Sequence, residues 1–122
     1  FRIHTILDKR MATLSGGTRQ KVSAILAFMF NPDVLILDEP TAGLDPLSSE
    51  ILKEKILVEK GKNKLVLITS HLLSELDDIV TQVIFMQEAI VRFHKGTEAL
   101  KIETGKDSIS KAISNILRQQ QA

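Results

Sequence analysis

The chain has no cysteine, no tryptophan and no tyrosine among its 122 residues. Without cysteine it can form neither a disulfide framework nor a thiolate metal site, which agrees with a reducing compartment. The shortage of aromatic rings on which bases could stack argues against a module that binds single-stranded nucleic acid. The 16 basic and 15 acidic residues nearly balance, so bulk charge does not favour nucleic acid or an anionic membrane as a partner.

Long apolar runs are also missing. The longest, residues 24–30, is far shorter than the roughly 20 residues that a helix needs to cross a bilayer. No basic-then-apolar leader opens the chain. We therefore expect any membrane contact to be made through a partner, and the length allows one small domain with a real core.

Hydrophobic periodicity predicts an amphipathic helix that begins at the glycine pair, residues 16–17. Ser15 stands where an N-cap belongs, and Asn31-Pro32 ends the helix because proline cannot continue it. The apolar positions recur at intervals of three and four residues, at Val22, Ile25, Leu26 and Met29.

Two apolar runs without alternation, residues 34–37 and 65–69, predict strands covered on both faces of a parallel sheet. Between them, Asp45 can cap a helix that has Pro46 at its first position and ends near residue 60. Strand, helix and strand then form a right-handed crossover. The residues of this helix expected to face inward are Leu47, Ile51 and Leu52.

The rest of the chain predicts a short helix at residues 73–79 and a hairpin of strands 83–86 and 90–93. Ala89 is an awkward turn residue, because a positive φ suits glycine or asparagine better, so the turn is of another type or strained. Asp107 is expected to cap a last helix. Its apolar stripe should pack as core or as a lid over the sheet: Ile109, Ala112, Ile113, Ile116 and Leu117. The fold class is α/β, with parallel strands, flanking helices and a C-terminal β-hairpin and helix.

Polar residues follow both predicted buried strands. Asp38 and Glu39 come at the end of the first, and Ser70-His71 comes after the second. In open parallel sheets, ligands bind beyond the carboxyl ends of the strands. An acidic pair there can divide two tasks, one carboxylate holding hydrated Mg²⁺ and the other orienting a water for attack on a phosphoryl group.

Three segments in order give the chain a specific resemblance. Residues 14–20 read Leu-Ser-Gly-Gly-Thr-Arg-Gln, residues 34–39 end in the acidic pair, and residues 40–46 read Pro-Thr-Ala-Gly-Leu-Asp-Pro. They resemble the signature motif, the Walker B strand and the D-loop of ATP-binding-cassette (ABC) ATPases, and His71 is similar to the H-loop histidine. The chain thus resembles the C-terminal half of an ABC transporter ATP-binding subunit, with a partial P-loop NTPase-type fold.

The resemblance implies ATP and Mg²⁺ as cofactors and a role for each matching residue. Asp38 would bind Mg²⁺ through water, Glu39 would act as the catalytic base, and His71 would contact the γ-phosphate. Asp45 would lie across a dimer interface as well as capping its helix. The signature residues would face the ATP of a second ABC subunit: Ser15, Gly16, Gly17 and Gln20.

The family's phosphate-cradling Walker A loop, Gly-x-x-x-x-Gly-Lys-Ser/Thr, does not occur in these residues. We therefore expect a fragment that does not hydrolyse ATP alone. Its expected parts are the end of a helical subdomain with the signature helix (1–31), core strands and helices (32–95) and a C-terminal helical segment (96–122). Strand edges left unpaired would favour self-association.

The favoured hypothesis is a transporter subunit that couples ATP hydrolysis to a separate membrane permease at the cytoplasmic face of the membrane. A second hypothesis is the C-terminal lobe of an ABC-type ATPase of chromosome maintenance or repair, but residues 1–14 show no heptads of the coiled coil that should then precede the signature. A third is a non-catalytic regulatory module. Residues 18–21 look more like bacterial exporter-type subunits than importers.

Overall fold

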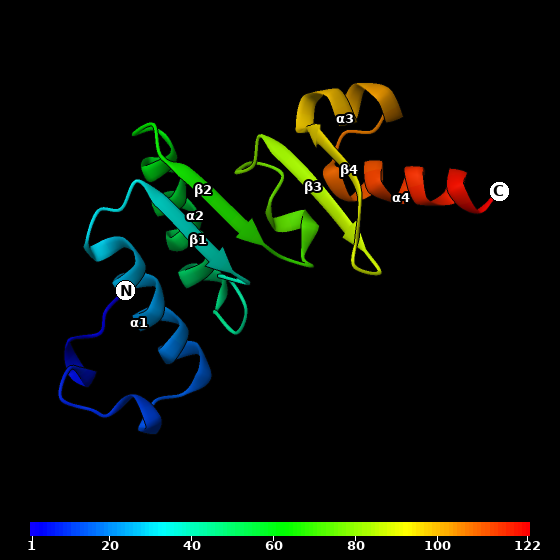
Figure 1. Ribbon diagram of the computed structural model, residues 1–122. Helices are drawn as coiled ribbons and strands as arrows, with labels where there is room; N and C mark the ends of the chain where they lie inside the picture. The colour runs from blue at the N-terminus through cyan, green and yellow to red at the C-terminus, as the bar shows by residue number, and fades with distance from the viewer. The chain divides into compact units, whose positions relative to one another are not determined.

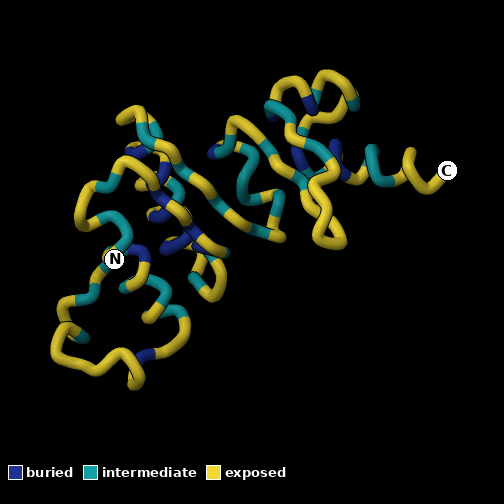
Figure 2. The backbone as a smooth tube through the Cα atoms, viewed as in Figure 1, coloured by how far each residue is buried: buried dark blue, intermediate teal, exposed yellow.

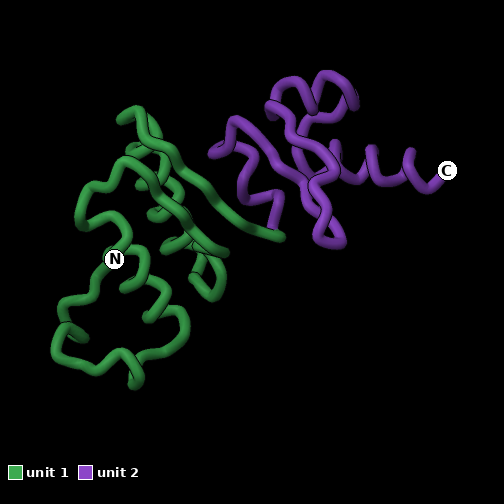
Figure 3. Tube along the Cα trace, viewed as in Figure 1, with its two compact units in different colours: residues 1–71 green, residues 72–122 purple.

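The computed structural model describes all 122 residues, and they divide into two compact units, residues 1–71 and 72–122 (Figure 3). The boundary lies inside the segment 32–95 that sequence assigned to one core. The finer division at residues 31 and 95 stays a prediction. Each unit is described separately.

The first unit contains two helices and two strands after two short 3-10 turns, His4–Ile6 and Met11–Thr13 (Figure 1). Helix α1 spans Gly16–Met29 and begins where predicted, because the Ser15 side chain accepts a hydrogen bond from the Thr18 amide. Strand β1 is Val34–Asp38, helix α2 is Pro46–Lys60 and strand β2 is Leu65–Thr69. The predicted order of elements in this half of the chain is confirmed.

Strands β1 and β2 pair in parallel, with Val34 opposite Leu65 and Asp38 opposite Thr69. Helix α2 forms the crossover between them and lies along one face of the pair (Figure 1). Leu35 and Leu37 are buried, but alternate side chains lie exposed on the other face. The prediction that both faces are covered is therefore wrong, because no element of residues 1–71 packs on the face formed by Val34, Ile36, Leu65 and Leu67.

Of the three residues of α2 that were predicted to face inward, Leu47, Ile51 and Leu52, only Leu52 is buried. Leu52 and Ile56 are each 1% exposed, whereas Leu47 is 70% exposed and Ile51 37%. The buried stripe runs through Ser48 and Ser49 to Leu52, Ile56 and Glu59, at helical spacing. Leu47 and Ile51 lie outside this stripe, so the expectation that they face inward is wrong.

The second unit opens with a single 3-10 turn, Leu73–Glu75, in place of the predicted helix over 73–79. Strands β3, Gln82–Gln87, and β4, Ile90–Gly96, form the predicted hairpin. Its loop has only two residues, Glu88 and Ala89, with φ values of 52° and 60°. Both residues have left-handed backbone conformations, as is usual in two-residue hairpin loops. Ala89 therefore adopts a positive φ, which is unfavourable for alanine, as predicted from the sequence for a strained turn.

Two helices follow the hairpin: α3, Thr97–Thr104, which the sequence did not predict, and α4, Ile109–Gln121. The apolar stripe of α4 packs as core, as expected. Leu100 of α3 and Ile109, Ala112 and Ile113 of α4 form the buried core of this unit, and the half-buried Phe85 and Phe93 pack against them. Figure 2 shows buried backbone segments in both helices.

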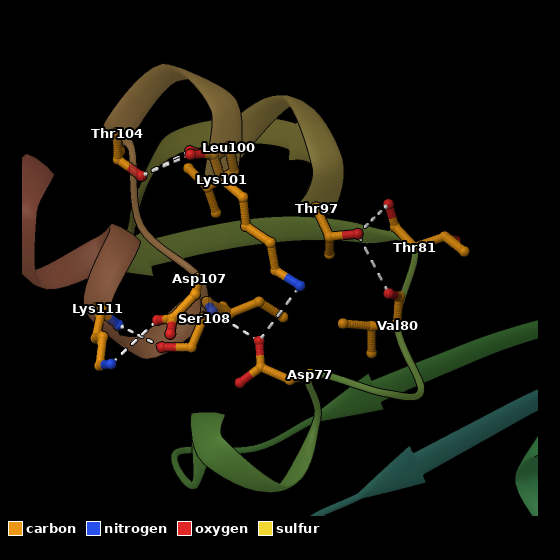
Figure 4. Close-up of polar contacts among 11 residues, drawn as sticks. Asp77, Val80, Thr81, Thr97, Leu100, Lys101, Thr104, Asp107, Ser108 and Lys111 are labelled. Carbon is orange, nitrogen blue, oxygen red and sulfur yellow. Dashed lines mark hydrogen bonds and ion pairs between the residues drawn. The ribbon is translucent and has the colours of Figure 1, made fainter.

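The start of α4 corrects the predicted cap. The Ser108 side chain, and not Asp107, accepts the Lys111 amide at 3.3 Å. Asp107 instead pairs with the Lys111 ammonium at 3.0 Å, which lowers the pKa of its carboxyl. The Asp77 carboxylate accepts the Ile109 amide at 2.7 Å and so ties the helix to the loop before β3 (Figure 4).

Candidate functional site

The ends of the two parallel strands bring the predicted acidic and polar groups together. Asp38 closes β1 opposite Thr69 of β2, and the Thr69 hydroxyl donates a hydrogen bond to the Asp38 carboxylate. One residue on, the Glu39 amide donates to the Thr69 carbonyl at 2.9 Å. The backbone of Glu39 then turns left-handed, with φ at 46°. The strand ladder thus extends to the acidic pair and stops there.

His71 lies beside the second carboxylate of the pair. Its Nδ1 is 2.8 Å from Oε1 of Glu39. The imidazole is 75% exposed and the Glu39 side chain 36%, so both are open to a ligand or water. The structure therefore joins two residues that the sequence placed 32 positions apart and assigned separate catalytic roles.

The donor set suits a magnesium ion that keeps most of its waters. No cluster of three or more acidic, histidine or cysteine side chains able to hold a metal occurs in the chain. What the strand end offers is the exposed Asp38 carboxylate, supported by the Thr69 hydroxyl. Mg²⁺ is commonly held by one or two carboxylates together with water and substrate phosphates, so these residues fit it.

The signature segment forms the first turn of α1. Ser15 Oγ lies 3.2 Å from the Thr18 amide and 2.8 Å from the Thr18 hydroxyl. The first amides of a helix have no acceptor within the helix, and their partial positive charge favours anions. Gly16 is exposed, and a Cβ built on it meets nothing within 4 Å. This end of the helix is accessible to an approaching phosphate.

Gly17 has a different environment from its neighbour. A Cβ added to it would lie 2.7 Å from the carbonyl oxygen of Gly43, inside the D-loop-like segment. Gly43 itself has a positive φ of 74°. The second signature glycine is therefore needed for close packing of two backbone segments, a role that the motif alone did not reveal.

Gln20 directs its amide group toward the acidic pair. Its Nε2 donates to the Glu39 carbonyl at 3.1 Å and to the Pro40 carbonyl at 2.8 Å. The side chain is half-buried between α1 and the end of β1, unlike the exposed Ser15 and Gly16. The family resemblance implied that Gln20, like Ser15 and Gly16, faces ATP. In the structure its amide nitrogen is hydrogen-bonded to the backbone of its own chain.

Asp45 is the helix cap that the sequence predicted. Its carboxylate accepts the Ser48 amide at 2.9 Å and the Ser48 hydroxyl at 2.7 Å, and Lys21 of α1 lies 3.2 Å away. The Ser48 hydroxyl, then the Ser48 amide and then Lys21 hold the pKa of Asp45 well below its usual range. Lys21 was missed by sequence reasoning, although it follows Gln20 directly on α1. Asp45 thus stays ionised and joins α1 to α2.

Comparison with known proteins agrees with these motifs. Residues 1–42 match the family model described as ABC transporter. The chain is 34% identical over 100 residues to the ABC transporter ATP-binding protein NatA of Bacillus subtilis, which covers 82% of the chain and 41% of NatA. Over 87 residues it is 32% identical to Nod factor export ATP-binding protein I of Paraburkholderia xenovorans, covering 71% of the chain and 29% of that protein.

A solved structure described as the ATP-binding subunit of an ABC transporter superposes with a TM-score of 0.79 at 26% identity. The match covers 88% of this chain and 45% of that one. The chain therefore spans less than half the length of NatA and of this structural neighbour. None of its helices has the length and hydrophobicity required to span a bilayer.

Proposed function

We propose that this chain, which is similar to ABC transporter ATP-binding proteins in its motifs, sequence and fold, supplies the metal-binding, water-activating and signature residues of an ATP-hydrolysing transporter subunit. The observation that carries the proposal is the grouping at the strand ends. Asp38, Glu39 and His71 lie together there, and His71 Nδ1 is 2.8 Å from the Glu39 carboxylate. The family resemblance gives each of these three residues a role that its position allows.

In this proposal Asp38 would hold hydrated Mg²⁺, with its carboxylate oriented by the hydrogen bond that the Thr69 hydroxyl donates. Mg²⁺ bound there would neutralise charge on the phosphates of ATP. Glu39 accepts a proton from the water that attacks the γ-phosphate, since a positioned carboxylate within hydrogen-bond reach can act as general base. His71 holds the Glu39 side chain in one orientation and presents its other ring nitrogen to the phosphate.

The signature turn is proposed to act on the ATP bound by a second ABC subunit. The open first turn of α1 at Ser15 and Gly16 supports this, because a helix N-terminus can bind phosphate oxygens through its amides. Asp45 would lie near the same dimer interface. We further propose that a Walker A loop outside these 122 residues cradles the nucleotide, because none occurs within them.

The transport partner is proposed to be a separate membrane permease, so that the subunit works at the cytoplasmic face of the membrane. We favour export over import. The support is the identity with a protein named for Nod factor export, together with the Thr-Arg-Gln-Lys sequence at residues 18–21.

Glu39→Gln in the complete ATPase tests the proposal. We expect turnover to fall by at least about 100-fold, the low end for removing a general base, while ATP still binds. Glu98→Gln, at an exposed position of α3, is the matched control and should leave turnover unchanged. Near-normal hydrolysis by Glu39→Gln would remove Glu39 from the role of base.

A further inference from the structure

We propose that Gln20 is a positioning residue for Glu39, which it orients by holding the Glu39-Pro40 backbone, and that it does not contact the nucleotide. The inference rests on the proposed function in one respect, that Glu39 is the base. Its evidence is the geometry of the Gln20 amide, which reaches across 19 and 20 residues of sequence to two successive carbonyls.

The backbone at Glu39 needs support from its neighbours. Its φ of 46° lies in the left-handed region, which an L-residue keeps only where the surroundings over-determine it. On the sheet side, the Glu39 amide donates to the Thr69 carbonyl at 2.9 Å. On the α1 side, Gln20 binds the Glu39 and Pro40 carbonyls, and Pro40 is buried with its φ fixed by its ring. The turn that aims the carboxylate is thus held from both sides.

Two further contacts keep α1 in register with the same segment. Gly17 packs so closely on the Gly43 carbonyl that no Cβ fits between them, and Lys21 pairs with Asp45 at 3.2 Å. Gln20 lies between Gly17 and Lys21 in sequence, and the carbonyls that it binds precede Gly43 and Asp45. Residues 17–21 of α1 therefore pack along the segment 39–45, and Gln20 binds the end of this segment that contains Glu39.

The hydrogen-bonding chemistry separates positioning from nucleotide binding. Two carbonyl oxygens can only accept, so the Gln20 side chain must donate to both. Gln20→Leu keeps similar volume and removes the donors, and Gln20→Glu replaces them with a carboxylate that repels the carbonyls. Gln20→Lys restores donors at similar reach. A positioning role predicts that Gln20→Lys is close to wild type and that Gln20→Leu and Gln20→Glu are impaired. A nucleotide contact predicts instead that Gln20→Lys binds ATP more tightly than wild type, because an ammonium group attracts phosphates.

The first test uses the 122-residue chain and needs no nucleotide. Gln20→Leu is compared with Gln120→Leu, an exposed position near the end of α4, by amide and imidazole NMR spectra. We expect large chemical-shift changes at Glu39, Thr41 and His71 for Gln20→Leu only, with near-wild-type spectra for Gln20→Lys. Unchanged Glu39 and His71 resonances in Gln20→Leu would overturn the proposal. If Gln20→Leu does not fold, Gln20→Glu against Gln20→Lys gives the same comparison.

The second test measures kcat and KM for ATP in the complete ATPase. Misplacement of a catalytic group by a fraction of an ångström to an ångström predicts a loss of kcat of about 10- to 100-fold for Gln20→Leu, with KM within roughly twofold of wild type. Gln20→Lys should recover most of the loss. A higher KM with unchanged kcat would indicate that Gln20 contacts the nucleotide and would overturn the inference. Unchanged values of both kcat and KM would also overturn it. Near-normal turnover of Glu39→Gln would instead refute the proposed base.

Discussion

Replacing Gly16 or Gly17 by alanine tests two properties of the signature segment separately: the open first turn at Gly16 and the close backbone packing at Gly17. At Gly17 the new Cβ would lie 2.7 Å from a backbone oxygen, that of Gly43, which cannot rotate away as a flexible side chain could. Overpacking of this kind costs about 1–3 kcal/mol. At Gly16 the new methyl group meets nothing within 4 Å. Both changes gain helix propensity of up to about 1 kcal/mol, so their difference reports the clash alone.

We therefore expect Gly17→Ala to be less stable than Gly16→Ala by about 1–3 kcal/mol. At a urea m-value of about 1–3 kcal/mol per molar, the midpoints of the two variants should differ by on the order of 1 M. The chain has no tryptophan or tyrosine, so far-UV circular dichroism is the suitable probe. Hydrogen exchange of the α1 and α2 amides would localise the change to residues 1–71.

Equal midpoints for the two variants would refute the reasoning, because they would mean that α1 and the loop at Gly43 do not pack as closely as described. The complete ATPase adds a second comparison. If the first turn of α1 binds the nucleotide of a second subunit as proposed, the Gly16→Ala variant should lose turnover there, because its methyl group would cover the free amides. Normal turnover of Gly16→Ala would mean that the exposed first turn of α1 does not bind phosphate.

Two further predictions concern stability and association. Hydrogen bonds from Lys55, then Lys64 and Lys62, lower the pKa of Glu59 from 4.5 to about 2, so their stabilisation is present above about pH 4.5 and is lost as the pH falls toward 2. Glu59→Gln should remove this part of the acid dependence of the urea midpoint, and an unchanged acid slope would contradict it. The exposed face of β1 and β2 should drive self-association that light scattering detects and that Ile36→Lys weakens. A monodisperse monomer at every concentration would refute that expectation.

Local rules predicted most of the first unit because each element there carries its own start and stop residues. Ser15 and Asp45 cap α1 and α2 as expected, and both caps are visible as short-range hydrogen bonds. Whether a sheet face is covered depends on which other elements pack on it, and the local sequence does not show this. The apolar runs at 34–37 and 65–69 therefore predicted that both faces are covered, whereas one face is exposed. Helix α3 has no side-chain cap at its start, so the sequence marks only its end, at Gly105, whose φ is 67°.

The candidate site shows the same limit at the level of single residues. Motif order predicted which residues gather at the strand ends, and Asp38, Glu39 and His71 do so. Adjacent letters of one motif nevertheless have different surroundings, because a helix turns each successive side chain by about 100°. Gly16 lies in the open and Gly17 against Gly43. This rotation leaves the first turn exposed and directs Gln20 toward the carbonyls of Glu39 and Pro40, so separate mutations within one short segment can test the proposed ligand contact and the proposed positioning of the base.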